Sequence, residues 1–383
     1  MRSILFILFA VLLTGCQLQI VYVTYNGNGA TAGNVPTDSK TYQQGATVTV
    51  LGNSGNLQYS GYAFAGWNTN ADGGGNSYAT AATFSIGRAN VTLYAVWIPS
   101  NLVFTSFGTR ITITGYVLAP SGSMAIPGGI TDIGDSAFSF CSSLTSVTFP
   151  SSVTSIGNYA FKNCSGLISA IIPASLTSLG TGAFYGCSGL TSVAIPSSLS
   201  SISDGAFFGC SGLTSLTISS SVTSIGGGAF GFCSSLTSVA FPSGITSIGD
   251  GAFEFCTSLA SLTTPPDVTS ISDSAFCGCS GLTSLTIHAS VTSINQQAFS
   301  GCTRLTSVTI PASVIYINQQ AFYGCSSLTN VIVQPTTPPL LWAGGLTFSL
   351  CAPAIQIHVP SGALARYKGA TGWSDYSSQI VSP

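Results

Sequence analysis

Cysteine is the residue whose spacing most strongly suggests chemistry in this sequence. A thiol can form a disulfide, bind a metal or act as a nucleophile. An interval of 23 residues separates successive members of a set of nine: Cys141, Cys164, Cys187, Cys210, Cys233, Cys256, Cys279, Cys302 and Cys325. Equivalent residues of stacked units lie about 4.8 Å apart, within disulfide range, but their side chains point in parallel and do not converge. We therefore predict a structural ladder of buried thiols that fill a core.

Other residues that could perform catalysis or bind a metal are sparse. A Ser-His-Asp triad would need His288 or His358, and we expect the first at an exposed strand end and the second in a terminal cap. Cys277 and Cys279 make an incomplete metal site without a nearby His or further Cys. Four aspartates recur near expected helix starts, where capping explains them: Asp135, Asp204, Asp250 and Asp273. We predict no catalytic residue, metal or cofactor.

A short segment near residue 70 partly fits a calcium loop. Asn68, Asn70 and Asp72 would supply oxygens at positions 1, 3 and 5, with Gly73 at position 6. The bidentate acid expected at position 12 is replaced by Ala79. We therefore favour a plain Asx/Gly turn over calcium binding.

Composition restricts the classes of partner. Only 5% of the 383 residues are charged and the formal net charge is -2, so the chain cannot form the basic stripe that nucleic acids require. Hydrophobic residues make up 45% of the chain, enough to bury a large core. The remaining surface must consist mostly of Ser, Thr, Gly and Asn. Such a composition favours a repeat array over an ordinary enzyme.

The repeating unit extends beyond the cysteine. A phenylalanine precedes each of the nine cysteines by three residues and a leucine follows each by three. In one unit, Leu144–Phe149 predicts a strand, Pro150 ends it because it has no N–H to donate, and residues 157–164 predict about two helical turns. Stacked units can bury a continuous apolar column that one unit cannot. We predict a repeat solenoid of 23-residue units, each with a short parallel strand and a short helix.

The unit resembles the BspA-like, or Treponema-type, leucine-rich repeat. Its pattern Leu-x-x-Val-x-Ile-Pro-x-x-Val-x-x-Ile-Gly-x-x-Ala-Phe-x-x-Cys is nearly unaltered in most units. The departures are Ala170 for Val, Thr264 for Ile, and Ser219, His288 and Gln334 for Pro. We expect these to cause local irregularities only. The resemblance implies an extracellular or host-interacting protein, and some family members are adhesins.

A separate β domain precedes the repeats. Alternating apolar residues and Asn/Gly turns predict several half-buried strands there. Val23-Thr-Tyr-Asn-Gly-Asn-Gly, Gly61-Tyr-Ala-Phe-Ala-Gly-Trp and Thr92-Leu-Tyr-Ala-Val-Trp97 resemble the Listeria–Bacteroides, or internalin-type B, repeat. This resemblance implies a β-grasp-like spacer found in bacterial surface proteins, with no catalytic role.

The N-terminus carries an export signal. Met1-Arg2 and the apolar run Ile4–Leu13 are typical of a signal peptide and too short for a transmembrane helix of ~20 residues. Leu13-Thr14-Gly15-Cys16 resembles a bacterial lipobox, which implies that Cys16 is lipidated. An ordinary signal peptide with an incidental cysteine is the alternative. Because Gln17 is not the Asp that often retains lipoproteins at the inner membrane, we expect the outer membrane or cell surface.

These features divide the chain into six parts. We expect a lipoprotein signal peptide at 1–15, a lipidated tether at 16–19, the Listeria–Bacteroides repeat at 20–98, an N-terminal cap at 99–123, nine leucine-rich repeats at 124–333, and an irregular repeat with a C-terminal cap at 334–383. Val103 to Val117 should supply strands of the first cap. Trp373 and Tyr376 should cover the last rung.

The outward side of the expected strands is the candidate ligand face. It repeats a neutral Ser-x-Thr pair, including Ser146, Thr148, Ser215, Thr217, Ser284, Thr286, Ser307 and Thr309. The array can be a merely solvated face, or it can bind a host protein, matrix protein or glycan. Ice binding is disfavoured by curvature and by the interruptions Ile171, Ala194 and Ala240.

We therefore predict a lipid-anchored cell-surface protein that mediates protein–protein or cell–host adhesion through its leucine-rich-repeat face. The alternative is a structural envelope spacer without a specific ligand. The membrane contact would be the lipid anchor alone.

Overall fold

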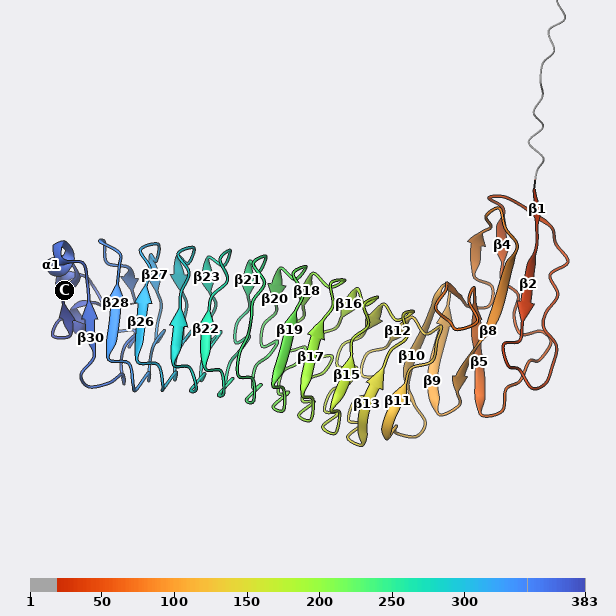
Figure 1. Ribbon diagram of the computed structural model, residues 1–383, viewed down its shortest axis with the longest axis horizontal. Helices are drawn as coiled ribbons and strands as arrows, with labels where there is room; N and C mark the ends of the chain where they lie inside the picture. The colour runs from red at the N-terminus through yellow and green to blue at the C-terminus, as the bar shows by residue number, and fades with distance from the viewer. Residues whose placement is uncertain (1–18, 343, 383) are drawn as a thin grey trace, which may run out of the picture.

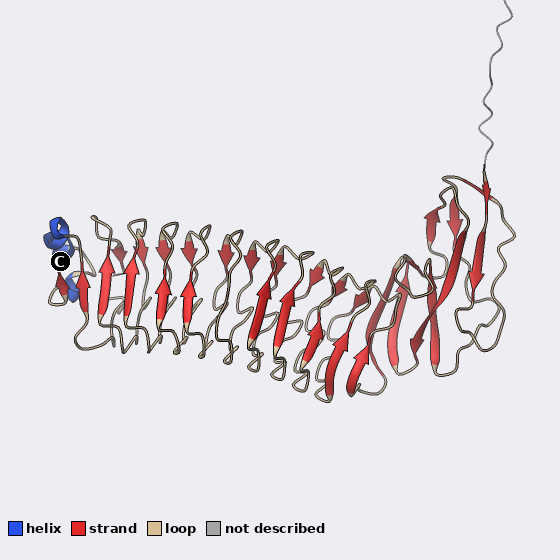
Figure 2. Ribbon diagram, viewed as in Figure 1, coloured by secondary structure: helices blue, strands red, loops and turns tan. Residues whose placement is uncertain are grey.

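The computed structural model describes residues 19–342 and 344–382. These residues form an elongated molecule in which a small β module meets one end of a long solenoid at an angle (Figure 1). Nearly all of the regular structure is strand, and the α-helix lies at the C-terminal end (Figure 2). Within the described ranges, no helix has both the length and the apolar character needed to cross a membrane.

The β module contains eight strands. They are β1 (Ile20–Val21), β2 (Val23–Asn26), β3 (Tyr42–Gln43), β4 (Thr47–Thr49), β5 (Tyr62–Asn68), β6 (Ser77–Tyr78), β7 (Thr83–Ser85) and β8 (Val91–Pro99). The main sheet has the order β2-β8-β5-β6, with β2 parallel to β8 and the other pairs antiparallel. Trp67 is fully buried, and Tyr25 and Phe64 pack edge-on against its ring. The aromatic residues thus form a core of the module's own.

A β-hairpin joins the module to the solenoid. β9 (Leu102–Phe107) and β10 (Arg110–Tyr116) pair antiparallel, and β10 then pairs in parallel with β12 (Asp132–Ile133). The module also touches the solenoid directly, because Ser77 Oγ donates to the Gly129 carbonyl at 2.7 Å. A Cβ added to Gly73 would lie 2.3 Å from the backbone of Gly128, so this contact requires glycine.

Most rungs contribute one strand to a row of longer strands, but residues 236–241 of one rung form no strand. The longer strands are β11 (Gly122–Ala125), β13 (Leu144–Thr148), β15 (Ser169–Ile171), β17 (Ser192–Ile195), β19 (Ser215–Ile218), β22 (Ser261–Thr263), β24 (Ser284–Thr286), β26 (Ser307–Ile310), β28 (Asn330–Val333), β30 (Gln356–His358) and β31 (Ile380–Val381). Neighbouring rungs pair in parallel, with Ser146 opposite Ser169. The offset of 23 residues is the period of the sequence, and the predicted parallel repeat solenoid is confirmed, with about 12 turns.

A second row of two-residue strands occupies another side of the solenoid. Its members are β12, β14 (Ser155–Ile156), β16 (Ser178–Leu179), β18 (Ser201–Ile202), β20 (Ser224–Ile225), β21 (Ser247–Ile248), β23 (Ser270–Ile271), β25 (Ser293–Ile294), β27 (Tyr316–Ile317) and β29 (Leu340–Leu341). They also pair in parallel, as Ser155 does with Ser178. The buried Ile or Leu of each pair explains the recurring Ser-Ile dipeptide.

The third side of each rung consists of turns, so the predicted short helix is wrong. Tyr159 and Asn163 have positive φ angles of 55° and 57°, and the equivalent residues of the other rungs also have positive φ. A right-handed helix excludes these angles. The backbone bonds instead run between rungs, as from Phe161 N to the Ala183 carbonyl at 2.7 Å.

The recurring aspartates likewise act between rungs, which corrects their interpretation as helix caps. Asp204 Oδ1 accepts from Gly227 N at 2.7 Å, and Asp273 Oδ1 accepts from Gln296 N at 3.0 Å. Asp135 and Asp250 make the corresponding bonds to Asn158 and Asp273. Each carboxylate therefore satisfies a backbone N–H exactly one repeat further along the chain.

A column of stacked phenylalanines runs through the core. Centroids of neighbouring rings lie 5.2–5.6 Å apart from Phe138 to Phe348. Tyr116 stacks on the first ring at 6.4 Å, while Trp373 and Tyr376 contact the last, as expected for a cap. The cap also contains η1 (Ser361–Ala363), α1 (Leu364–Gly369) and η2 (Ser374–Tyr376). The column is thus covered at both ends.

Candidate functional site

The eight hydroxyl residues proposed as a ligand face lie on the longer strands. They are Ser146 and Thr148 on β13, Ser215 and Thr217 on β19, Ser284 and Thr286 on β24, and Ser307 and Thr309 on β26. Seven are exposed, whereas Ser146 is half-buried with its Oγ 2.8 Å from Ser123 Oγ. Ile171 and Ala194 occupy outward positions between β13 and β19. The structure therefore brings the pairs of β24 and β26 together but separates the others.

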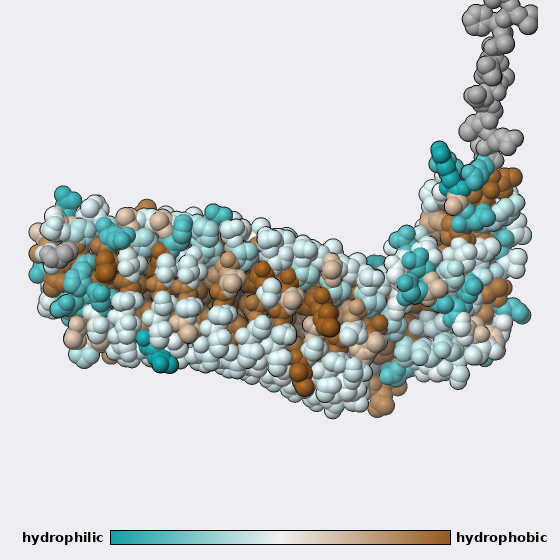
Figure 3. Space-filling model, viewed as in Figure 1, coloured by the Kyte–Doolittle hydropathy of each residue, from teal (hydrophilic) through white to brown (hydrophobic). Residues whose placement is uncertain are grey.

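This strand face offers hydrogen bonds without charge. Much of the solenoid surface in Figure 3 is of intermediate hydropathy, and a broken hydrophobic band crosses the longer strands. Each hydroxyl can donate one bond and accept others. Ser and Thr are nevertheless under-represented among the residues that dominate protein interfaces. The face can orient a partner but is a poor source of binding energy.

The nine ladder cysteines are buried beside the phenylalanine column. All eleven described cysteines are free thiols. From Cys164 to Cys325, each ladder thiol donates to the phenylalanine carbonyl 26 residues earlier, with Sγ–O distances of 3.0–3.5 Å. Burial raises the pKa of Cys233 to about 12. A buried neutral thiol is a poor nucleophile, so this arrangement serves packing and hydrogen bonding.

The structure assembles no catalytic or metal-binding cluster around the residues considered for those roles. Cys279 is in the core ladder, and Cys277 is half-buried. His288 Nδ1 lies 3.1 Å from Ser290 Oγ of its own rung, and His358 lies on β30 opposite Ile332. Within residues 19–342 and 344–382, no three His, Cys, Asp or Glu residues are grouped to hold a metal.

The calcium-like segment uses its own oxygens to close a turn. Asn68 Oδ1 accepts from the N–H groups of Asn70 and Gly75 at 2.8 and 3.1 Å. Asp72 Oδ1 accepts from Gly74 N at 2.9 Å. This geometry is that of Asx turns, in which backbone donors occupy the oxygens that a cation would need.

A row of aromatic side chains on the turn side forms a second candidate surface, which we call the aromatic ridge. It consists of one residue from each of six successive rungs: Phe140, Tyr159, Tyr185, Phe208, Phe232 and Phe255. From Tyr185 onward, neighbouring ring centroids lie 4.8–5.1 Å apart. Lys162 Nζ lies 5.2 and 5.6 Å from the centroids of Tyr159 and Tyr185, which gives cation–π contact with both.

Three phenylalanines of the aromatic ridge have backbone conformations that destabilise the fold. Phe140, Phe232 and Phe255 have φ angles of 63°, 59° and 53°, in the left-handed region that disfavours bulky residues. These residues are 65%, 42% and 39% exposed, so burial compensates only in part. The equivalent position is glycine in five other rungs: Gly186, Gly209, Gly278, Gly301 and Gly324. The requirements of the fold therefore do not explain these phenylalanines.

Comparison with protein-family models identifies both repeat types. The model of the BspA type leucine rich repeat region matches residues 119–237 and 223–340, which together cover more than half of the chain. The chain belongs to the BspA-type leucine-rich repeat family. The model of the Listeria-Bacteroides repeat domain matches residues 22–96. Both resemblances inferred from the sequence are confirmed.

Two curated proteins of Evansella cellulosilytica share a short region with this BspA-type chain. Their provisional names are membrane protein and Gly-rich membrane protein, and each is 37% identical over 79 residues. The region is 21% and 20% of this chain, but only 12% and 9% of the relatives. The chain thus spans about a tenth of their lengths.

Several solved leucine-rich repeat structures are similar to the BspA-type chain. A protein from Bacteroides ovatus is 20% identical with a TM-score of 0.49, over 75% of this chain and 99% of its own. A leucine rich cell surface protein from Faecalibacterium prausnitzii is 23% identical with a TM-score of 0.40, over 72% and 97%. The leucine-rich repeat protein of T. pallidum is 27% identical with a TM-score of 0.39, over 54% and 90%.

BspA-type proteins are surface proteins that generally bind other proteins, and the family typically provides non-enzymatic interaction scaffolds. Reasoning from the sequence missed the aromatic ridge. For five of its six residues, the signal lies in the two positions between the core Phe and the Cys of a BspA-type unit, such as Gly231-Phe232 and Glu254-Phe255, whereas Tyr159 precedes its core Phe161. Because a helix was expected there, nothing predicted that these side chains would point to the same side of the solenoid in successive rungs.

Proposed function

We propose that this BspA-type protein is exported, is anchored to the bacterial outer membrane or cell surface through a lipid on Cys16, and adheres to a host or matrix protein. Leu13-Thr14-Gly15-Cys16 supports the anchor, because the cysteine stands where lipoprotein processing needs it. Cys16 itself lies outside the described residues. Membership of a surface-protein family supports the location.

The observation that carries the adhesion proposal is the aromatic ridge. Aromatic side chains are enriched at the centres of protein interfaces, where they supply much of the binding energy. Phe232 and Phe255 remain exposed at unfavourable φ angles where glycine would fit better. A partner that covers their rings would recover the burial that the free protein lacks.

The ridge favours a protein over a glycan as partner. Tyr185 and Phe208 stack with an interplanar angle of 11°, so each ring covers one face of the other. Ring edges and the remaining apolar surface suit side chains of a protein, whereas a sugar ring prefers an open aromatic face. The sparse charge of the chain provides little electrostatic steering, so we expect shape and avidity to dominate.

The test is binding of the purified protein to a panel of host matrix proteins. Replacing Phe232→Gly and Phe255→Gly together should weaken binding by at least about tenfold. Unfolding stability should stay unchanged or rise, because glycine accepts positive φ without strain. The control replaces Ser215→Tyr and Thr217→Tyr, which makes the strand face bulky and should leave binding unchanged. Loss of binding only in this control would show that the strand face with Ser215 and Thr217 binds the partner and that the aromatic ridge does not.

A structural spacer is the second candidate function, favoured by the uniform and elongated stack (Figure 1). Deletion of residues 213–235 removes one unit of 23 residues and leaves the register of the remaining rungs intact. A spacer should tolerate this deletion. An adhesin should lose binding, because the deletion removes Phe232 and changes the ridge.

The anchor and the location can be tested in cells. Cys16→Ala should release the protein from the membrane fraction and abolish incorporation of labelled palmitate. Protease added to intact cells should remove the repeats if they face outward. Protection until the cells are permeabilised would contradict the surface location and favour an envelope spacer.

A further inference from the structure

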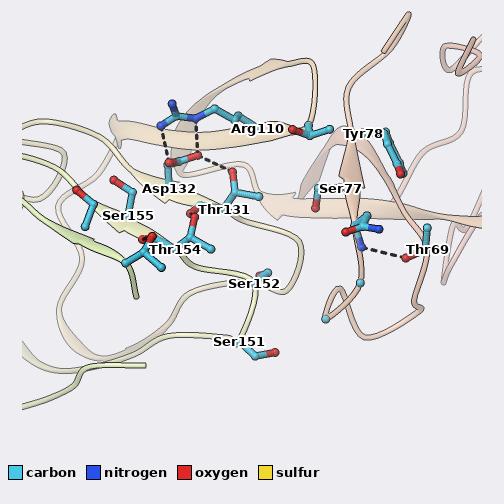
Figure 4. A pocket seen from close by; sticks show the side chains of 16 residues that line it. Thr69, Ser77, Tyr78, Arg110, Thr131, Asp132, Ser151, Ser152, Thr154 and Ser155 are labelled. Carbon is cyan, nitrogen blue, oxygen red and sulfur yellow. Dashed lines mark hydrogen bonds and ion pairs between the residues drawn. The ribbon is translucent and has the colours of Figure 1, made fainter. Parts of the chain in front are cut away.

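A polar cleft lies where the β module meets the first rungs of the solenoid (Figure 4). Its volume is about 940 Å³, within the range of sites that hold small organic ligands. One wall comes from residues 69–78 of the module and the other from the hairpin and the first solenoid rungs. Hydroxyl groups dominate the lining, including Thr69, Thr131, Ser151, Ser152, Thr154 and Ser155.

The cleft contains an ion pair between Arg110 and Asp132, and the next two rungs have serine at the position of Asp132. Arg110 Nε and Nη2 donate to Asp132 Oδ2 and Oδ1 at 3.0 and 2.5 Å. The Asp132 side chain is 6% exposed, whereas that of Arg110 is 66% exposed, so part of the guanidinium faces solvent. Asp132 aligns with Ser155 and then Ser178 in the next two rungs. The cleft therefore gains a fixed donor group, while the pair carries no net charge.

Ser152 is a second departure from the repeat in the same cleft. Its Oγ is buried without a hydrogen-bond partner, and the residue is 9% exposed. The equivalent serines of other rungs donate to a carbonyl 22 residues earlier, as Ser175 does to Val153 at 2.6 Å and Ser313 does to Val291 at 2.7 Å. An unpaired buried hydroxyl destabilises the fold. Ser152 lines the cleft, so a ligand that enters there can supply the missing hydrogen-bond partner.

We propose that this junction cleft binds a neutral, hydroxyl-rich ligand of the oligosaccharide class. Serine and threonine hydroxyls both donate and accept, which matches the hydroxyls of a sugar. The outward donors of Arg110 add directional bonds, and Asp132 cancels the charge that would select an anion. The site is separate from the aromatic ridge and does not rest on the proposed adhesion.

The test is calorimetric titration of the purified protein with neutral tetrasaccharides: cellotetraose, maltotetraose, xylotetraose and chitotetraose. At least one should bind. Thr154→Trp places a bulky side chain in the cleft and should weaken binding by at least about tenfold. Thr246→Trp is the matched control, because Thr246 is the equivalent exposed residue four rungs away and makes the same bond to the previous rung. It should leave binding unchanged.

A second pair of variants separates binding from folding. Ser152→Ala removes the unpaired hydroxyl, so it should weaken binding without lowering the urea midpoint. Ser175→Ala removes a bonded hydroxyl outside the cleft, so it should lower the midpoint without affecting binding. Failure of all four tetrasaccharides to bind would overturn the proposal. Equal binding by the Thr154→Trp protein, or selective binding of inorganic phosphate in their place, would also overturn it.

Discussion

Cys233 Sγ donates a hydrogen bond to the Phe207 carbonyl, 26 residues earlier in the chain, at 3.3 Å. The same oxygen accepts from Cys210 N of its own rung at 3.2 Å. One carbonyl thus joins two rungs at the centre of the core. Cysteine suits this position because it is small, tolerates burial and retains a weak donor.

Replacing this cysteine should therefore destabilise the solenoid in two ways. Cys233→Ala loses the thiol bond and leaves a cavity, so we expect a loss of about 1–3 kcal/mol in the free energy of unfolding. Urea unfolding followed by circular dichroism measures it. Cys277→Ala is the control, because Cys277 is only half-buried. An equal loss in both variants would show that the ladder position has no special role.

Alkaline pH should also destabilise the protein. Burial raises the pKa of Cys233 from 9.0 to about 12. Below pH 9 this thiol is neutral in both the folded and unfolded states. Between pH 9 and 12 the unfolded state loses a proton that the folded state keeps, so stability falls by about 1.4 kcal/mol per pH unit for each such thiol.

This prediction can be isolated from the titration of other groups. Urea midpoints measured at several pH values between 8 and about 11 should fall less steeply in Cys233→Ala than in the parent protein. The difference between the two slopes should correspond to one proton released on unfolding. Identical pH dependence in the two proteins would contradict a raised pKa at Cys233.

A substitution within the phenylalanine column should destabilise mainly the neighbouring rungs. Phe207 stacks on Phe184 and Phe230 at 5.5 Å, so Phe207→Ala removes contacts with two rungs. We expect a loss of about 3–5 kcal/mol. Because each rung contacts only its neighbours, hydrogen exchange should accelerate most strongly near residues 184–230. Phe208 is half-buried, so Phe208→Ala should cause a smaller loss. Uniform acceleration along the solenoid would contradict a local response.

The stability of one rung can be raised by adding a side-chain hydrogen-bond acceptor at position 227. Asn158 Oδ1 accepts from Thr181 N at 2.9 Å, whereas the equivalent residue three rungs later is Gly227. A Cβ at Gly227 would make ordinary contact, at 3.4 Å from the Asp250 carbonyl. Gly227→Asn should therefore raise stability by about 1 kcal/mol.

The neighbouring glycine provides the control for this gain. Gly228 has a φ of 58°, so Gly228→Ala should lower the thermal midpoint while Gly227→Asn raises it. A decrease in both variants would show that the inter-rung acceptor bond does not form.

The sequence by itself determined the repeat architecture. Nine units of equal length must stack in one register if each is to bury its Phe, Leu and Cys, and Phe161, Cys164 and Leu167 are all fully buried. The same periodicity predicted the outward hydroxyls of β13, β19, β24 and β26. It also allowed the family to be recognised before any contact was known.

Only the tertiary structure decided the turn side and the junction. The segment from 157 to 164 has helix-like apolar spacing, but bonds to the next rung and positive φ at Tyr159 and Asn163 replace the helix. Four of the six ridge residues, Phe140, Tyr159, Phe232 and Phe255, have such positive φ angles. The pairing of Arg110 with Asp132 and the unpaired hydroxyl of Ser152 depend on which carbonyls and side chains lie nearby in space. Local sequence patterns do not encode such neighbours, because they arise when distant segments pack together.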